Sequence, residues 1–182
     1  SNSIYRKLSI QAGLNGLSFC VLDTITNKIL AFERVNFKTQ LTPYLMLKEL
    51  KEKLSKQGEV GRNFSEVMVI HKNNMFGLVP KPLYIPYTNV NNYIFELFGA
   101  FEFKHSGTVL INTLLKQNRT SSEPVCYVQV SEREMEMMVI SDKKLLFYNQ
   151  FEYRNKEDFL YYLLFSLEQL QMDLEKVNLK LF

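Results

Sequence analysis

The chain has 182 residues, 46% of them hydrophobic, which suits one domain or two small ones with a buried core. Its net charge of +3 comes from interspersed residues, so the composition excludes a strongly basic surface for nucleic acid. No apolar run reaches the ~20 residues that span a bilayer, and no secretory signal is evident, so we expect a cytoplasmic protein without membrane insertion.

The first part of the chain predicts three antiparallel strands joined by short turns. Residues 8–12 alternate apolar and polar side chains, which is the period of a strand. Residues 17–22 are apolar on both faces, as in a sheet that is covered on both sides, and residues 29–32 begin a third strand. Asn15 and Gly16 in the first turn form a dipeptide that is typical of hairpins.

Helices and single strands are expected to alternate after these three strands. Thr42 and Pro43 predict the start of a helix that ends before Gly58. We expect its apolar stripe to contain Leu45, Leu47, Leu50 and Leu54. Further strands are expected at residues 66–70, 76–80 and 101–103, an irregular connection at 80–86, and helices capped by Thr88 and Ser106.

The same pattern restarts near residue 125, which suggests an internal duplication. An alignment of Gln11 with Gln129 also pairs Phe19 with Met137. Three more strands are followed by a helix with a capping box at Asn155 and Asp158, and by the start of a strand at residues 178–182. We therefore expect two subdomains, residues 1–120 and residues 121–182, the second of them incomplete.

The cysteines and histidines are expected to be structural. Cys20 and Cys126 lie inside apolar runs, which favours buried free thiols over a disulfide or a metal site. His71 follows a strand and is expected in a turn, and His105 is expected to cap backbone groups at the end of a strand. Neither cysteine has an obvious catalytic base nearby.

The order of elements is similar to that of the actin-like ATPase superfamily, whose ribonuclease H-like subdomain is duplicated. Short stretches at residues 8–11, 17–21, 76–80 and 103–106 resemble an uncharacterised family from Bacteroidetes, domain of unknown function 3822. The resemblance implies an α/β fold of two ribonuclease H-like halves, each a mixed sheet flanked by helices. It implies no activity, because that family has none assigned. Its members are usually longer than this chain.

Active members of the superfamily begin each half with a strand and hairpin of the form Asp-x-Gly. The aspartate positions a metal-bound water or ion, and the backbone amides of the turn hold phosphates. The resemblance places Gln11, Gly13, Asn15 and Gly16 at this position, as a degenerate phosphate-binding turn. Because Gln11 and its repeat Gln129 are neutral, we expect no catalytic residue, no bound metal and no cofactor.

A nuclease site on the same fold would need several carboxylates that converge on two metal ions. Asp23, Glu33 and Glu66 are present, but Gln11 takes the essential place on the first strand. We therefore set the nuclease interpretation aside.

The leading interpretation is a catalytically inactive pseudoenzyme that acts as a binding or scaffolding module for an unidentified protein partner. Aromatic side chains left uncovered by the incomplete second half would suit such a partner. One alternative is a nucleotide-binding ATPase or phosphotransferase with a rearranged site at Gly13, Asn15 and Gly16. Another is an assembly platform similar to the actin-like proteins of pilus and secretion machines.

Overall fold

The computed structural model describes residues 5–56, 58, 63–74, 76–78 and 82–182. The chain forms two compact units, Ser1–Val109 and Leu110–Phe182, and helix α3 (Ser106–Gln117) spans the division between them. Among the described residues, no helix is both long enough and apolar enough to cross a membrane. The boundary expected after residue 120, where the pattern of elements restarts, stays a prediction from the sequence.

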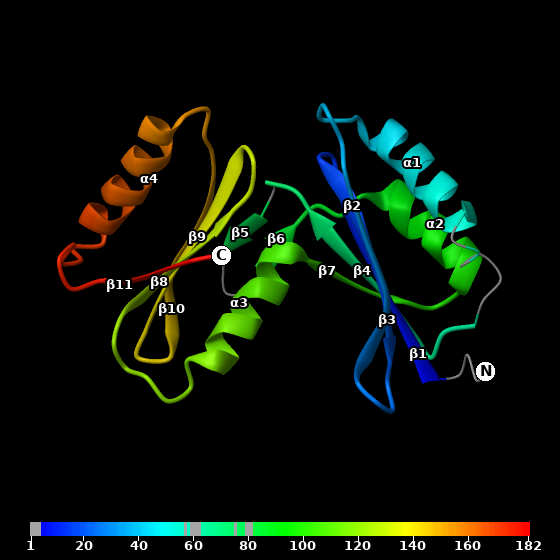
Figure 1. The fold of residues 1–182 in the computed structure, drawn as a ribbon, viewed down its shortest axis with the longest axis horizontal. Coiled ribbons are helices and arrows are strands. Elements are labelled where there is room, and N and C mark those ends of the chain that lie inside the picture. The colour runs from blue at the N-terminus through cyan, green and yellow to red at the C-terminus, as the bar shows by residue number, and fades with distance from the viewer. Residues whose placement is uncertain (1–4, 57, 59–62, 75, 79–81) are drawn as a thin grey trace. The chain divides into compact units, whose positions relative to one another are not determined.

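Unit 1 contains a five-stranded mixed sheet in the order β3-β2-β1-β4-β7 (Figure 1). Its strands are β1 (Arg6–Gly13), β2 (Gly16–Asp23), β3 (Lys28–Asn36), β4 (Glu66–Lys72) and β7 (Glu102–His105). The three sequential strands β1, β2 and β3 pair antiparallel, whereas β4 and β7 run parallel to β1. The carboxyl ends of β1, β4 and β7 therefore lie at one edge of the sheet.

Two helices, α1 (Pro43–Lys56) and α2 (Thr88–Phe98), pack together in unit 1 (Figure 1). Thr42 caps α1 as expected, since its Oγ1 accepts a hydrogen bond of 3.3 Å from the backbone N–H of Leu45. The buried side chains of both helices join those of β1, β2 and β4 in one hydrophobic core. The short strands β5 (Phe76–Leu78) and β6 (Pro82–Tyr84) pair separately.

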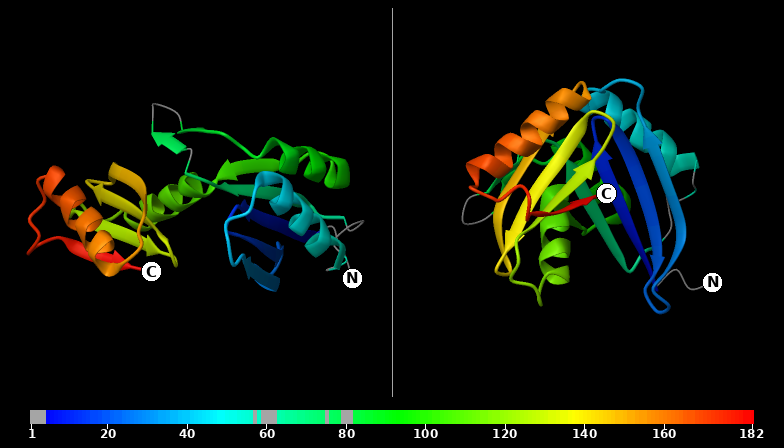
Figure 2. Two further views of the ribbon diagram at one scale, coloured as in Figure 1. Left: turned by 90° about the horizontal axis from the view of Figure 1, so that it is seen from above. Right: turned by 60° about the vertical axis from the view of Figure 1, so that its left-hand side comes forward.

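Unit 2 contains a four-stranded sheet in the order β10-β9-β8-β11 (Figure 2). Its elements are β8 (Val125–Val130), β9 (Glu134–Ser141), β10 (Lys144–Glu152), α4 (Lys156–Gln169) and β11 (Asn178–Leu181). The inner face of α4 packs on the sheet, and Asn155 caps the helix as expected, with its Oδ1 accepting from the N–H of Asp158 at 2.8 Å. The expected capping box is incomplete, because Asp158 Oδ2 accepts from the N–H of Arg154 at 3.0 Å instead of that of Asn155. At the end of α3, Asn118 Nδ2 donates to Tyr127 Oη on β8 at 2.7 Å.

The two units are copies of one topology. Elements β8, β9, β10, α4 and β11 repeat the order, pairing and direction of β1, β2, β3, α1 and β4. Both third strands also carry a β-bulge at the same place, because the pairing skips Leu30 in β3 and Leu146 in β10. Each bulge lies two residues after the start of its strand. Since a bulge depends on local backbone detail, its repetition supports duplication more strongly than strand order alone.

One expected core position is wrong. Leu45 was expected in the apolar stripe of α1, but its side chain is 42% exposed. Met46, Leu50 and Leu54 are buried instead. These three residues are spaced four apart and share one face of the helix, from which Leu45 is turned by about 100°.

The region between β4 and α3 also differs from expectation. The connection at 80–86 contains β6, and Val79 and Pro80 of the strand expected at 76–80 lie outside the described residues. Tyr87 rather than Thr88 is the N-cap of α2, and Ser106 is the first residue of α3 rather than its cap. Phe103 is exposed, because β7 forms the edge of its sheet.

Two leucines at equivalent positions of α1 and α4 allow the contribution of core packing to the stability of each unit to be tested. Leu50 and Leu163 lie eight residues after the helix caps Thr42 and Asn155, and both are buried. We expect Leu50→Ala and Leu163→Ala each to lower the free energy of unfolding of its own unit by about 2–5 kcal/mol, because each leaves a cavity. Leu45→Ala is the control, with an expected loss below about 1 kcal/mol. Urea unfolding followed by circular dichroism measures all three, and equal losses would contradict this packing.

Candidate functional site

The β1–β2 hairpin forms the candidate phosphate-binding turn. Gly13 pairs with Gly16, and Leu14 and Asn15 form the two-residue turn between them. Neither turn residue has a positive φ, so the mirror-image turn that Asn-Gly usually predicts does not form. The carbonyl oxygens of Leu14 and Asn15 accept hydrogen bonds of 2.8 and 2.9 Å from the backbone N–H groups of Leu41 and Phe37. These bonds tie the turn to the segment that leads into α1.

Both glycines of the hairpin lie where other backbone segments approach closely. A Cβ atom on Gly16 would lie 2.5 Å from the carbonyl oxygen of Val35, and one on Gly13 would lie 3.2 Å from that of Lys72. Neither glycine has a positive φ. Close packing against β3 and β4 therefore explains why glycine occupies both positions, without any bound phosphate.

Gln11 lies in the middle of the unit 1 sheet, two residues before Gly13 at the end of β1. It pairs with Ser18 on β2 and with Ile70 on β4, and its side chain is partly buried. Gln129 takes the equivalent place on β8 and pairs with Glu136 on β9. The structure therefore confirms that the two glutamines are equivalent. It brings Gln11, Gly13 and Gly16 into one hairpin and leaves Asn15 exposed at its tip.

Glu136 is a candidate that the sequence analysis missed. Its side chain is only 4% exposed, and its Oε1 accepts a hydrogen bond of 2.7 Å from Gln150 Nε2. Burial, together with the charge of Glu136, raises the pKa of the Tyr148 hydroxyl. The available signal was a glutamate inside the apolar run of residues 135–140, because a charged residue in the middle of a strand needs a buried partner.

The two histidines lie side by side on β4 and β7, where His71 pairs with His105 in the parallel register. His71 lies in β4 rather than in the expected turn, and both side chains are fully buried. Backbone N–H groups donate to both Nδ1 atoms, from Tyr87 at 3.3 Å and from Gly107 at 3.0 Å. Each Nδ1 is therefore an acceptor, and the proton of each neutral ring lies on Nε2.

Those Nε2 protons also have partners. His71 Nε2 donates to Asn91 Oδ1 at 2.8 Å, and His105 Nε2 donates to the carbonyl oxygen of Asn73 at 2.8 Å. Burial lowers the pKa of His71 from 6.5 to about 4 and also lowers the pKa of His105. The nitrogens of both rings therefore take part in hydrogen bonds within the protein, which is consistent with the structural role expected of the two histidines.

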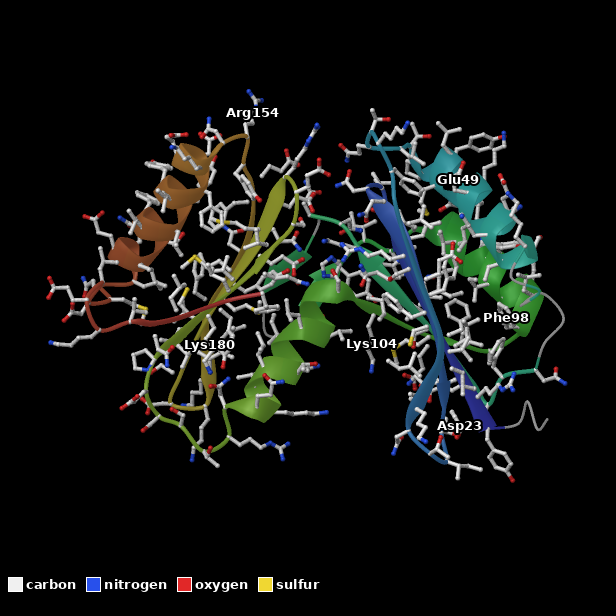
Figure 3. All side chains as sticks on the ribbon, in the orientation of Figure 1. Asp23, Glu49, Phe98, Lys104, Arg154 and Lys180 are labelled. Carbon is white, nitrogen blue, oxygen red and sulfur yellow. The ribbon has the colours of Figure 1, made fainter. Side chains whose placement is uncertain are left out.

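The carboxylates considered for a nuclease site do not converge. Asp23 lies at the β2–β3 hairpin, at the opposite end of β2 from Gly16, and its Oδ1 accepts from the N–H of Ile25 at 2.9 Å (Figure 3). Glu33 forms an ion pair with Lys53, and Glu66 forms one with Lys7. Within the described part of the chain, no three His, Cys, Asp or Glu residues are placed to hold a metal ion.

The cysteines are free thiols, as expected. Cys126 is fully buried on β8, and burial raises the pKa of its thiol to about 12. A thiol with so high a pKa is protonated at neutral pH and is a poor nucleophile. Cys20 is only partly buried on β2.

Two repeats of a mixed sheet with flanking helices define the fold, which is the duplicated ribonuclease H-like arrangement known as the actin-like ATPase fold. The family described as "Protein of unknown function (DUF3822)" matches residues 1–86 and 82–182, and the chain belongs to that family. Both findings confirm the resemblance seen in the sequence. A search of curated proteins gave no match.

Two of the similar solved structures serve for comparison of the fold. A protein from Bacteroides thetaiotaomicron, described as having an actin-like ATPase fold and unknown function, has a TM-score of 0.82 at 18% identity, covering 98% of this chain and 81% of that one. An exopolyphosphatase from Cytophaga hutchinsonii has a TM-score of 0.52 at 13% identity, covering 91% of this chain. This chain spans 62% of the exopolyphosphatase. At these identities the likeness shows the fold alone.

The hairpin glycines can be tested through stability. Gly16→Ala is expected to lower the free energy of unfolding by about 1–3 kcal/mol, because its Cβ would meet the backbone of Val35, which cannot move without distorting β3. Gly13→Ala should cost less, since its nearest contacts are longer. Urea unfolding measures both variants. An unchanged stability in Gly16→Ala would show that close packing does not explain this glycine.

The buried histidine predicts a pH dependence. The unfolded chain binds a proton to His71 below about pH 6.5, whereas the folded protein binds it only near pH 4. The free energy of unfolding should therefore fall as the pH is lowered, by at most about 3 kcal/mol from this group. Urea unfolding between pH 7 and pH 5 measures the fall before most carboxylates titrate.

His71→Gln provides the comparison for this pH series. We expect the variant to be less stable than the parent protein at pH 7, because the hydrogen bonds to Tyr87 and Asn91 are disturbed. It should also lose less stability between pH 7 and pH 5. An unchanged pH dependence would assign the effect to other groups, with His105→Gln as the next variant to measure.

Proposed function

We propose that this protein is a catalytically inactive member of the actin-like fold that acts as a binding or scaffolding module. The observation that carries the proposal is the equivalence of Gln11 and Gln129 on β1 and β8. The resemblance to the superfamily implies that these are the positions at which its active members carry an aspartate. An amide is neutral and is a weak ligand for Mg²⁺, so neither glutamine supplies the negative charge that holds the metal.

The geometry of the hairpin supports the same proposal. The carbonyl oxygens of the turn are bound to the N–H groups of Leu41 and Phe37, and the backbone of β3 fills the space beside Gly16. The hairpin is therefore explained by packing within unit 1. We further propose that the protein is cytoplasmic and that its partner is another protein rather than nucleic acid.

One observation favours a second candidate function, a nucleotide-dependent ATPase or phosphotransferase. Glu136 provides a buried carboxylate opposite Gln129, at the hairpin of the second repeat. A rearranged site in which Glu136 replaces the missing aspartate would need a free carboxylate oxygen directed at the ligand. The hydrogen bond from Gln150 and the burial of the side chain speak against it. Nothing specific favours an assembly platform over other binding roles.

Isothermal titration with Mg-ATP tests the proposal. We expect no binding up to millimolar nucleotide, because Gln11 and Gln129 supply no carboxylate for the metal and the carboxylate of Glu136 is buried. Gln11→Ala and Glu136→Gln are the matched variants for the two hairpins. Micromolar binding that is lost in Gln11→Ala would refute the proposal. Binding that is lost only in Glu136→Gln would establish the second candidate function instead.

A further inference from the structure

Helix α3 is capped by a side chain that can change its charge. His105 ends β7 and directly precedes Ser106, the first residue of α3. The backbone N–H of Gly107 donates to His105 Nδ1 at 3.0 Å, which is the bond that an N-cap residue makes with the second residue of its helix. The usual N-cap residues keep their charge between pH 5 and pH 8, whereas a histidine titrates in this range when it is exposed.

The hydroxyl groups in the same turn do not share this role. Ser106 Oγ and Thr108 Oγ1 are buried, and neither has a hydrogen-bond partner among the described residues. The ring of His105 is fixed from its other side, because Nε2 donates to the carbonyl oxygen of Asn73 at 2.8 Å. The start of α3 therefore depends on one neutral ring that accepts through Nδ1 and donates through Nε2.

A second proton on this ring removes the cap. Both nitrogens of an imidazolium carry a proton, so Nδ1 can no longer accept from Gly107 and two N–H groups face each other. The positive charge would also lie at the N-terminus of α3, which is the positive end of the helix dipole. Burial lowers the pKa of His105, in agreement with a folded state that resists this proton.

The groups described around His105 supply no negative charge that would stabilise the proton. They are His71 on β4, the carbonyl oxygen of Asn73 after β4, and Tyr84 on β6, whose ring centroid lies 5.4 Å from that of His105. Burial raises the pKa of Tyr84, so its hydroxyl is neutral. The two histidines repel each other when charged, since His105 contributes to the lowered pKa of His71. The charged residues beside them lie on the opposite face of the sheet, because side chains alternate along a strand: Lys72 and Lys104.

We propose that His105 is a proton-operated cap of α3, and that uptake of a second proton releases the first turn of this helix from unit 1. The cap is complete above about pH 6.5, where an exposed histidine is neutral. It weakens as the pH falls, because the released ring binds a proton more readily than the buried ring. Since α3 spans the division between the two units, the proton acts where the chain passes from one unit to the other.

Hydrogen exchange followed by mass spectrometry tests the cap in the full chain. Exchange rates in residues 107–111, divided by those of an unstructured peptide at the same pH, report how often the first turn opens. Between pH 7 and pH 5 we expect opening to become about 3- to 25-fold more frequent, and the upper value is the limit for one histidine that titrates at 6.5 when released. The start of α4 is the internal control, because its cap Asn155 does not titrate. Its opening should change by less than about twofold.

His105→Asn is the matched variant, because asparagine caps a helix through Oδ1 and carries no titratable group. We expect this variant to keep the first turn of α3 protected at both pH values and to abolish the change between them. His105→Ala removes the cap itself, so the turn should exchange faster than in the parent chain at pH 7 and should show no further change at pH 5.

Three results would overturn the proposal: unchanged exchange at the start of α3 between pH 7 and pH 5, an equal change at the start of α4, or a change that persists in His105→Asn. Circular dichroism shows whether each variant is folded. If His105→Asn is not, the parent chain alone decides, through a comparison of α3 with β1. An equal rise of exchange in both would show that unit 1 unfolds as a whole, whereas a rise confined to the start of α3 supports the cap.

Discussion

Strand β1 is paired along both edges, antiparallel to β2 and parallel to β4, and the rest of unit 1 depends on this double pairing. The antiparallel side needs a hairpin, and the parallel side needs a crossover, which α1 supplies. The hairpin closes because Gly13 and Gly16 have no side chains to hold Lys72 and Val35 away. Strand β8 has the same two neighbours in unit 2, β9 and β11, so the same constraint is met twice in one chain.

This arrangement also determines which side chains lie at the carboxyl ends of the parallel strands, beside the β1–β2 hairpin. The end of a central parallel strand is where an α/β sheet presents polar groups to a ligand. In unit 1 that edge holds Gln11, two neutral histidines and glycines whose space is taken by backbone. Both histidines are hydrogen-bonded within the protein, whereas the buried hydroxyls of Ser106 and Thr108, just after β7, have no hydrogen-bond partner among the described residues.

Much of the fold could be predicted because the signals are local. The alternation in residues 8–12 and the caps at Thr42 and Asn155 depend on near neighbours in sequence, and each forms as expected. Other positions depend on distant residues. The burial of Met46 instead of Leu45 reflects where the sheet lies, and the histidine pair exists because β4 and β7 are adjacent in register. Glu136 was missed for the same reason, since its partner Gln150 lies on another strand.

The sequence by itself determined the order of the elements, their repetition and the presence of a glutamine on the first strand of each repeat, Gln11 and Gln129. These follow from side-chain periodicity, caps and residue identity, which need no knowledge of distant contacts. Only the tertiary structure decided that Gln11 and Gln129 are equivalent in register, that Gly13 and Gly16 are required by packing, and that both histidines are fully bonded. It also showed that α4 is apolar on two faces, because burial depends on which surfaces the sheet and neighbouring helices cover.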